Sequence, residues 1–161
     1  MIGTHADICN RKQTEGQLQH LIAGTANTTG QQFFVALVRH IAEALNVSYV
    51  LVSKVIGNRG QSLSFWCNGK LQPNIVYDLP LTPCEYVSQI GEYSCEKSVQ
   101  EKFPDDTDLV SMDAESYLGM ALYNTQNKMI GHLCILDTKP LNDLKDTKAI
   151  LEAFAATLLL N

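Results

Sequence analysis

Residues 115–141, which read ESYLGMALYNTQNKMIGHLCILDTKPL, decide the fold. Two apolar runs, at 117–122 and 129–136, flank the polar residues 124–128, which favour a chain reversal. Both runs are too continuously apolar to leave one face in water. The pattern therefore predicts a hairpin in the middle of a sheet, with helices covering at least part of it. Pro140 ends the second strand, because proline cannot donate to a central ladder.

The residues upstream of this hairpin predict a helix followed by three strands. Residues 29–45 carry apolar side chains at helical spacing, after a capping-box spacing at their start. Residues 47–56 are β-branched and aromatic, and residues 62–67 alternate apolar with polar side chains. Asn68 and Gly69 favour a tight hairpin, after which residues 71–77 are predicted as an edge strand containing a proline.

A further helix is predicted from Pro83 to about Gly91. Thr82 suits the N-cap, Pro83 the first helical position, and Glu85 would close a capping box. Cys84 then falls in the first turn, where the positive end of the helix dipole lowers the pKa of a thiol. A last helix with a largely apolar sequence is predicted from about residue 144.

Composition limits the classes of function. The chain has 161 residues with a net charge of -5, and its lysines and arginines form no cluster that would neutralise phosphates, which argues against a nucleic-acid partner. No apolar run approaches the roughly 20 residues that span a bilayer. The amino terminus lacks the basic flank and apolar core of a secretory signal, so we expect a cytoplasmic protein with no membrane contact. Five widely spaced cysteines do not suggest a disulfide framework.

The motif ESYLG-x-x-L, a short turn and IGHLCILD-x-KPL resemble the last two strands of a GAF domain, the small-molecule sensing module of bacterial signalling proteins. The resemblance is greatest to the variety beside PAS domains in sensor histidine kinases, including the cyanobacterial type. It extends to Phe33-Phe34-x-x-Leu37, to Leu81-Thr82-Pro83-Cys84-Glu85 and to Phe103-Pro104-Asp105-Asp106, and so covers most of the chain. It implies an α+β, GAF-like and PAS-related fold with a central antiparallel sheet of about five or six strands, flanked by helices, and with the N- and C-terminal helices packed together.

The resemblance also implies a domain boundary. Residues 1–27 resemble the end of a PAS domain and the linker helix after it, with Cys9 and Asn10 in place of the usual Thr and Glu. An ordinary polar leader is the alternative. Residues 28–161 would form the GAF domain.

In GAF folds the region before the final hairpin forms the ligand pocket, so the resemblance places a lid at residues 83–112. The pocket candidates are Trp66, Cys84, Tyr86, Cys95, Phe103, Tyr117 and His132. The alternative for the aromatic residues is that they only fill the core. The sequence has no phosphate-binding glycine loop, nucleophile elbow or paired histidines, so we predict no catalytic residue and no metal ligand.

The ligand is not identified by the family's motifs. Covalent bilin attachment uses a Cys-His dipeptide that does not occur here, and the cyclic-nucleotide signature is not continued after Asn127-Lys128, so neither cofactor is supported. Thiolates of Cys84, Cys95 and Cys134 are soft ligands that suit an iron–sulfur cluster, haem or zinc. The favoured alternative is that these cysteines are small core residues, with Cys84 as the exception.

The resemblance implies a sensory domain that binds a small molecule or senses redox state. It would pass the signal through its terminal helices to an output domain such as a histidine kinase, would dimerise through those helices, and would not itself be an enzyme. Two alternatives stay open: a dimerisation module without a ligand, and a redox switch or enzyme centred on Cys84.

Overall fold

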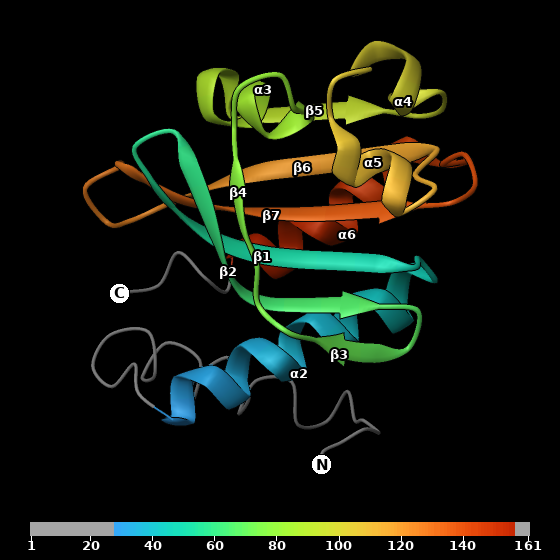
Figure 1. The fold of residues 1–161 in the computed structure, drawn as a ribbon. Helices are drawn as coiled ribbons and strands as arrows, with labels where there is room; N and C mark the ends of the chain where they lie inside the picture. Colours follow the sequence, from blue (N-terminus) through green and yellow to red (C-terminus); the bar gives the residue numbers. More distant parts are fainter. Residues whose placement is uncertain (1–27, 157–161) are drawn as a thin grey trace.

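The computed structural model describes residues 28–156 (Figure 1). The helices and strands, in chain order, are α2 (Thr28–Leu45), β1 (Tyr49–Ile56), β2 (Arg59–Cys67), β3 (Lys70–Gln72), β4 (Val76–Asp78), α3 (Pro83–Ile90), β5 (Glu92–Cys95), α4 (Val99–Lys102), α5 (Thr107–Ser111), β6 (Ser116–Tyr123), β7 (Met129–Asp137) and α6 (Leu144–Ala156). The strands form one antiparallel sheet in the order β3-β2-β1-β7-β6-β5, and β4 also pairs with β2. The predicted α+β architecture is confirmed.

The hairpin predicted at residues 115–141 holds the middle of the sheet. β7 pairs with β6 on one side and with β1 on the other, and β6 is flanked in turn by β5. Both hairpin strands are buried along nearly their whole length, as their continuous apolar sequence predicted. Asn124 closes the turn, because its Oδ1 accepts the backbone N–H groups of Gln126 and Lys128.

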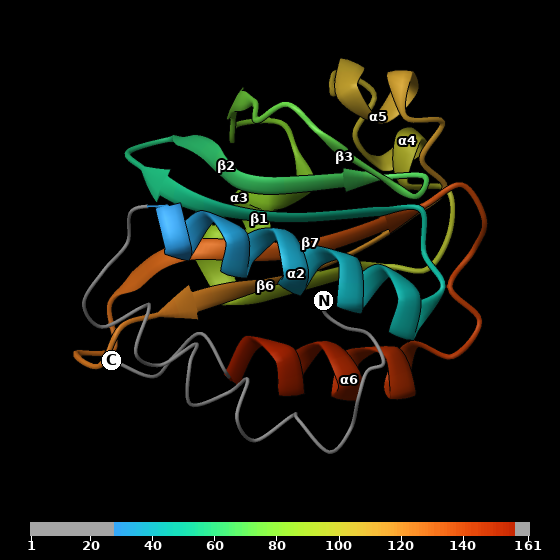
Figure 2. The same ribbon diagram turned by 90° about the horizontal axis from the view of Figure 1, so that it is seen from below.

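Helices α2 and α6 lie side by side on one face of the sheet (Figure 2). Their buried side chains include Val38, Ile41 and Leu151, which pack against inward-facing residues of β1, β6 and β7. The predicted packing of the terminal helices is confirmed for this pair. The expected PAS-like end and linker helix, at residues 1–27, lie outside the described residues. No helix in the described part of the chain is long and apolar enough to span a membrane.

The three shorter helices α3, α4 and α5 cover the opposite face (Figure 1). Of these, α3 lies over the strands β5, β6 and β7. A second core is buried beneath them and is formed by Tyr49, Leu51, Leu79, Cys84, Val87, Cys95, Val99, Phe103, Leu109, Ala114, Tyr117, Ala121, Cys134 and Leu136. The segment predicted as a lid therefore covers one face of the sheet.

The start of α3 lies where it was predicted, but its capping box does not form. The N-cap Thr82 uses its hydroxyl to donate to the carbonyl of Leu79 at 2.7 Å. The Glu85 carboxylate accepts from the N–H of Leu81 at 3.4 Å and not from that of Thr82. The cause is the tight turn before the helix, in which Leu81 has a φ of 69°. Gly91 ends the helix with a φ of 96°, as predicted.

The single strand predicted at residues 71–77 is divided into β3 and β4, which gives seven strands where five or six were expected. Pro73 has no N–H to donate to the ladder at this point. Ser62 bridges the break, since its Oγ donates to Asn74 Oδ1 at 2.9 Å and accepts the N–H of Ile75 at 2.8 Å. β2 therefore keeps a partner along both short strands.

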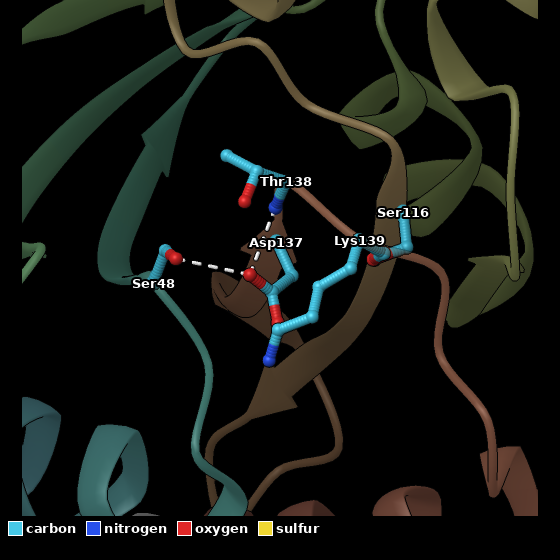
Figure 3. A network of polar contacts seen from close by, with 5 residues as sticks. All are labelled: Ser48, Ser116, Asp137, Thr138 and Lys139. Carbon is cyan, nitrogen blue, oxygen red and sulfur yellow. Dashed lines mark hydrogen bonds and ion pairs between the residues drawn. The ribbon is translucent and has the colours of Figure 1, made fainter.

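A buried carboxylate fixes the end of the central hairpin to the start of β1 (Figure 3). Asp137 is 3% exposed, and its Oδ1 accepts from Ser48 Oγ at 2.9 Å and from the Thr138 N–H at 2.8 Å. Lys139 Nζ lies 3.6 Å from Oδ2, and the carbonyl of Lys139 accepts from Ser116 Oγ at 2.8 Å. These contacts satisfy a charge that would otherwise be costly to bury.

Candidate functional site

Four buried polar side chains meet between α3 and the middle of the sheet, and we call them the thiol cluster: Cys84, Tyr117, His132 and Cys134. Cys84 lies in the first turn of α3, Tyr117 on β6, and the other two on β7. His132 and Cys134 are two residues apart on a strand, so both side chains point to the same face. Only Cys84, at 7% exposed, retains any notable accessibility.

The Tyr117 hydroxyl joins the two thiols. Its oxygen lies 3.1 Å from the Sγ of Cys84 and 3.1 Å from the Sγ of Cys134. The two sulfur atoms are 4.0 Å apart. Apolar side chains alone would bury this face of the sheet equally well. The Tyr117 hydroxyl and the two thiols are therefore not needed to fill the core, and they are available for chemistry.

Gly119 makes the position of the Tyr117 ring possible. It pairs with Cys134 across the hairpin and lies two residues after Tyr117, on the same face of β6. A Cβ at residue 119 would overlap the Tyr117 hydroxyl and would lie 2.9 Å from both the Tyr117 Cζ and the Val87 Cγ2. The missing side chain thus leaves the space through which the hydroxyl reaches the sulfur atoms.

His132 connects the thiol cluster to a second turn of α3. Its Nε2 lies 2.8 Å from Ser88 Oγ, and its buried Nδ1 has no hydrogen-bond partner among the described residues. One nitrogen of the ring lies within 4.8 Å of both sulfur atoms. An imidazole with one nitrogen held and the other unpaired is suited to accept a proton or a metal ion.

The two thiols differ in acidity because they share a hydrogen bond. The hydrogen bond with Cys134 lowers the pKa of Cys84, assisted by His132 and Tyr117 and opposed by burial. The same hydrogen bond and burial raise the pKa of Cys134. The pair therefore holds a single negative charge more easily than two. Burial, together with the thiols, raises the pKa of Tyr117 and of nearby Tyr77, so both phenols remain protonated.

An aromatic group adjoins the thiol cluster. The ring centroids of Tyr86 and Tyr93 are 5.2 Å apart, and the Phe103 centroid lies 5.8 Å and 5.7 Å from them. Tyr93 continues this group to Tyr117, at 6.2 Å. Tyr86 is 43% exposed and Phe103 is 8% exposed, so the group runs from the surface to the buried thiols.

The structure brings five of the seven pocket candidates into one connected region: Cys84, Tyr86, Phe103, Tyr117 and His132. Trp66 is not among them. It lies opposite Val50 in the β1–β2 register and packs against the α2 and α6 side of the sheet. Cys95 is buried on the correct face, but its Sγ donates to the carbonyl of Lys97 at 3.0 Å.

Several residues of this region were not among the candidates. Cys134 was interpreted as core filling, and it is buried, but its sulfur faces Cys84. Ser88 is four residues after Cys84 in a predicted helix, so its shared face could have been inferred from spacing. Tyr93 had no such signal, because it reaches the site through its pairing with Gly119.

Comparison with known proteins supports the fold. The sequence matches no protein-family model and no curated protein. Among solved structures, the GAF domain of A. aeolicus nlh2 in an inactive state is similar at a TM-score of 0.62 and 12% identity, covering 94% of this chain and 93% of that one. The phycoerythrobilin-bound GAF domain of a cyanobacterial phytochrome gives 0.67 and 12%, covering 92% and 91%.

A longer solved structure contains a similarly folded unit inside a larger protein. The bacteriophytochrome RpBphP3 from R. palustris has a TM-score of 0.65 and 9% identity, covering 98% of this chain and 38% of that one. The chain thus spans well under half the length of this protein. At such identities the similarity is one of fold. The chain therefore has the fold of a GAF domain.

Proposed function

We propose that this chain is a sensory GAF domain that receives its input at the thiol cluster. It passes the signal through α2 and α6 to an attached output domain, such as a histidine kinase, and catalyses no reaction itself. The observation that carries the proposal is the buried pair Cys84 and Cys134, 4.0 Å apart between a helix and the central strand. Unpaired thiols persist in a reducing cytoplasm, which is where we place the chain.

The input fits a redox signal. The Cys84 thiolate attacks one oxygen of a peroxide, which forms a sulfenic acid and releases hydroxide. The Cys134 thiol then attacks that sulfur, which forms a disulfide and releases water. Two electrons pass from the thiols to the peroxide. Because a disulfide requires the sulfur atoms to approach to about 2.05 Å, we expect its formation to draw the first turn of α3 toward β7.

A route from α3 to the terminal helices supports the relay. Gly91 ends α3 and leads directly into Glu92 on β5. The Glu92 carboxylate lies 2.6 Å from Lys148 Nζ on α6, and α6 packs beside α2. A shift of α3 would therefore change the position of α6 and, through its packing, of α2.

A small ligand is the second candidate input, favoured by the aromatic group at Tyr86. Its partly exposed ring leads inward through Tyr93 to Tyr117, as a flat apolar ligand would require. Bilin attachment remains unsupported, since no cysteine is followed by histidine. Mass spectrometry of the denatured extract would identify a retained ligand.

The proposed relay also involves a homodimer formed through the terminal helices. Ile150 on α6 is 38% exposed, which supports an apolar contact on this helix. Light scattering over a range of concentrations measures the mass. A monomer at all concentrations would contradict the dimer.

The redox proposal is tested on the reduced full chain with a small excess of hydrogen peroxide. We expect intact mass to show the loss of both thiol hydrogens, peptide mapping to join residues 84 and 134, and amide hydrogen exchange in α6 to change. Cys84→Ser and Cys134→Ser should abolish these effects, whereas Cys67→Ser, at a half-buried thiol outside the cluster, should preserve them. A peroxide-treated chain whose thiols stay reduced, or whose α6 exchange is unchanged, would refute the proposal.

A further inference from the structure

The thiol cluster contains the ligand set of a metal site. Cys84, His132 and Cys134 each offer one donor atom, and these atoms all lie within 4.8 Å of one another in a buried position. Two sulfurs and one imidazole nitrogen are the donors that zinc takes in proteins. The sequence had suggested Cys84, Cys95 and Cys134 as possible thiolate ligands, but no metal ligand was predicted. His132 was not considered as a metal ligand, because Cys84 and His132 belong to elements that are far apart in the chain.

The sulfur separation fits a shared metal ion better than it fits a bond. Two thiolates on a tetrahedral zinc, with Zn–S bonds of about 2.3 Å, lie roughly 3.8 Å apart. The Sγ atoms of Cys84 and Cys134 are 4.0 Å apart. A disulfide would need this distance to fall to about 2.05 Å. Metal binding therefore requires little movement of either sulfur.

The histidine provides a second, independent observation. Ser88 Oγ lies 2.8 Å from Nε2 of His132, while the buried Nδ1 has no hydrogen-bond partner among the described residues. A histidine that ligates zinc has this arrangement, because its other nitrogen donates to a neighbouring acceptor that fixes the tautomer and the ring orientation. A buried nitrogen without a partner is costly unless something binds it.

The charge of the ligands favours a divalent metal ion. A buried site is stable only when its charges are balanced. Two thiolates with a neutral imidazole carry two negative charges, which a divalent ion neutralises and a monovalent ion does not. The Tyr117 hydroxyl, 3.1 Å from each sulfur, can donate to a thiolate in the same arrangement.

We propose that Cys84, Cys134 and His132 bind one Zn²⁺ ion, with Ser88 positioning the imidazole and Tyr117 supporting the thiolates. Binding forms one Zn–S bond to the Cys84 thiolate and replaces the S–H bond of Cys134 by a second Zn–S bond, which releases one proton to solvent. The inference rests on the proposed function for the role of the site as an input: oxidation of the thiols to a disulfide would expel the ion. A bound ion would hold the first turn of α3 against β7.

The test uses the full chain, reduced and stripped of metal, and titrates it with Co²⁺ as a spectroscopic probe and then with Zn²⁺. We expect one equivalent of Co²⁺ to give thiolate charge-transfer bands in the near ultraviolet and intense d–d bands typical of tetrahedral coordination. One equivalent of Zn²⁺ should bleach them.

Variants identify the ligands. Cys84→Ser, Cys134→Ser and His132→Gln should each weaken Zn²⁺ binding by more than about 100-fold, and Ser88→Ala by about 10- to 100-fold. The matched control is Cys95→Ser, a thiol that is 2% exposed but bonded to Lys97, and it should bind as the unmodified chain does. Circular dichroism shows whether each metal-free variant is folded. If a variant does not fold, the cobalt spectrum of the unmodified chain still reports whether thiolates bind the metal.

The outcomes separate this inference from the proposed function. No tetrahedral cobalt spectrum in the unmodified chain, or a spectrum retained in both Cys84→Ser and Cys134→Ser, would overturn the zinc site. If peroxide still joins residues 84 and 134 in that case, the redox proposal stands alone. If Zn²⁺ binds and its loss leaves α6 exchange unchanged, the site stands and the sensory role falls.

Discussion

Replacing Gly119 by alanine tests whether the thiol cluster depends on the space above this residue. The new methyl group would overlap the Tyr117 hydroxyl and lie 2.9 Å from Tyr117 Cζ and from Val87 Cγ2. Such overpacking costs about 1–3 kcal/mol. The φ of Gly119 is not positive, so alanine regains about 0.4–1 kcal/mol by restricting the unfolded chain. We expect a net destabilisation of about 1–2 kcal/mol, measured by urea unfolding under reducing conditions.

Two second-site variants show which contacts cause the destabilisation of Gly119→Ala. Tyr117→Phe removes the closest atom, and Val87→Ala removes the methyl group on the other side. In double-variant cycles each should recover about 0.5–1 kcal/mol of the loss at Gly119. Alkylation should also become slower at Cys84 in Gly119→Ala, because the displaced hydroxyl no longer lies 3.1 Å from its sulfur and no longer stabilises its thiolate. A variant as stable as the unmodified chain, with unchanged alkylation, would show that the ring does not need this space.

Three further predictions concern residues outside the thiol cluster. Asp137→Ala should lower the free energy of unfolding by about 3 kcal/mol in urea titrations, because the Ser48 hydroxyl loses the buried, charged carboxylate that accepts its hydrogen bond. A loss below about 1 kcal/mol would contradict this. Burial and the charge of Asp108 raise the pKa of Asp106 to about 6. The folded state therefore binds this proton more tightly than the unfolded state does. The associated stability is present below about pH 4 and is lost as pH rises through 6. After allowance for solvent screening, Asp106→Asn should be more stable than the unmodified chain by about 1 kcal/mol at pH 7 and equal at pH 4, and the opposite order in thermal unfolding would refute the assignment. Lys148→Met breaks the ion pair with Glu92, where the side chains are 32% and 43% exposed, so it should cost only about 0.2–1 kcal/mol and less in high salt, and a larger loss would mean that the pair is structurally essential.

Local chemistry was sufficient to predict most of the elements. The hairpin of β6 and β7, the Asn68-Gly69 turn and the ends of α3 were each marked by the backbone preferences of a few adjacent residues. Pro73 gave a partial signal: it indicated an edge strand but not that the strand would divide. Thr82 and Glu85 had capping-box spacing, but a turn set by Leu81 redirected both side chains.

The site itself was decided by tertiary structure. The sequence placed Cys84 at a helix start and Cys134 on a buried strand. The two cysteines are 50 residues apart in the sequence, so no local pattern predicts that their sulfur atoms lie in contact. Strand register determined which face of the sheet each side chain occupies. Phe65 and Trp66 are neighbours on β2, yet Phe65 packs on the face of the thiol cluster and Trp66 on the face of α2. Because side chains alternate along a strand, pairing between distant segments fixes the composition of each face. Local propensity makes the strands, whereas the contact of Cys84, His132 and Cys134 exists only once those strands have paired and α3 has packed across them.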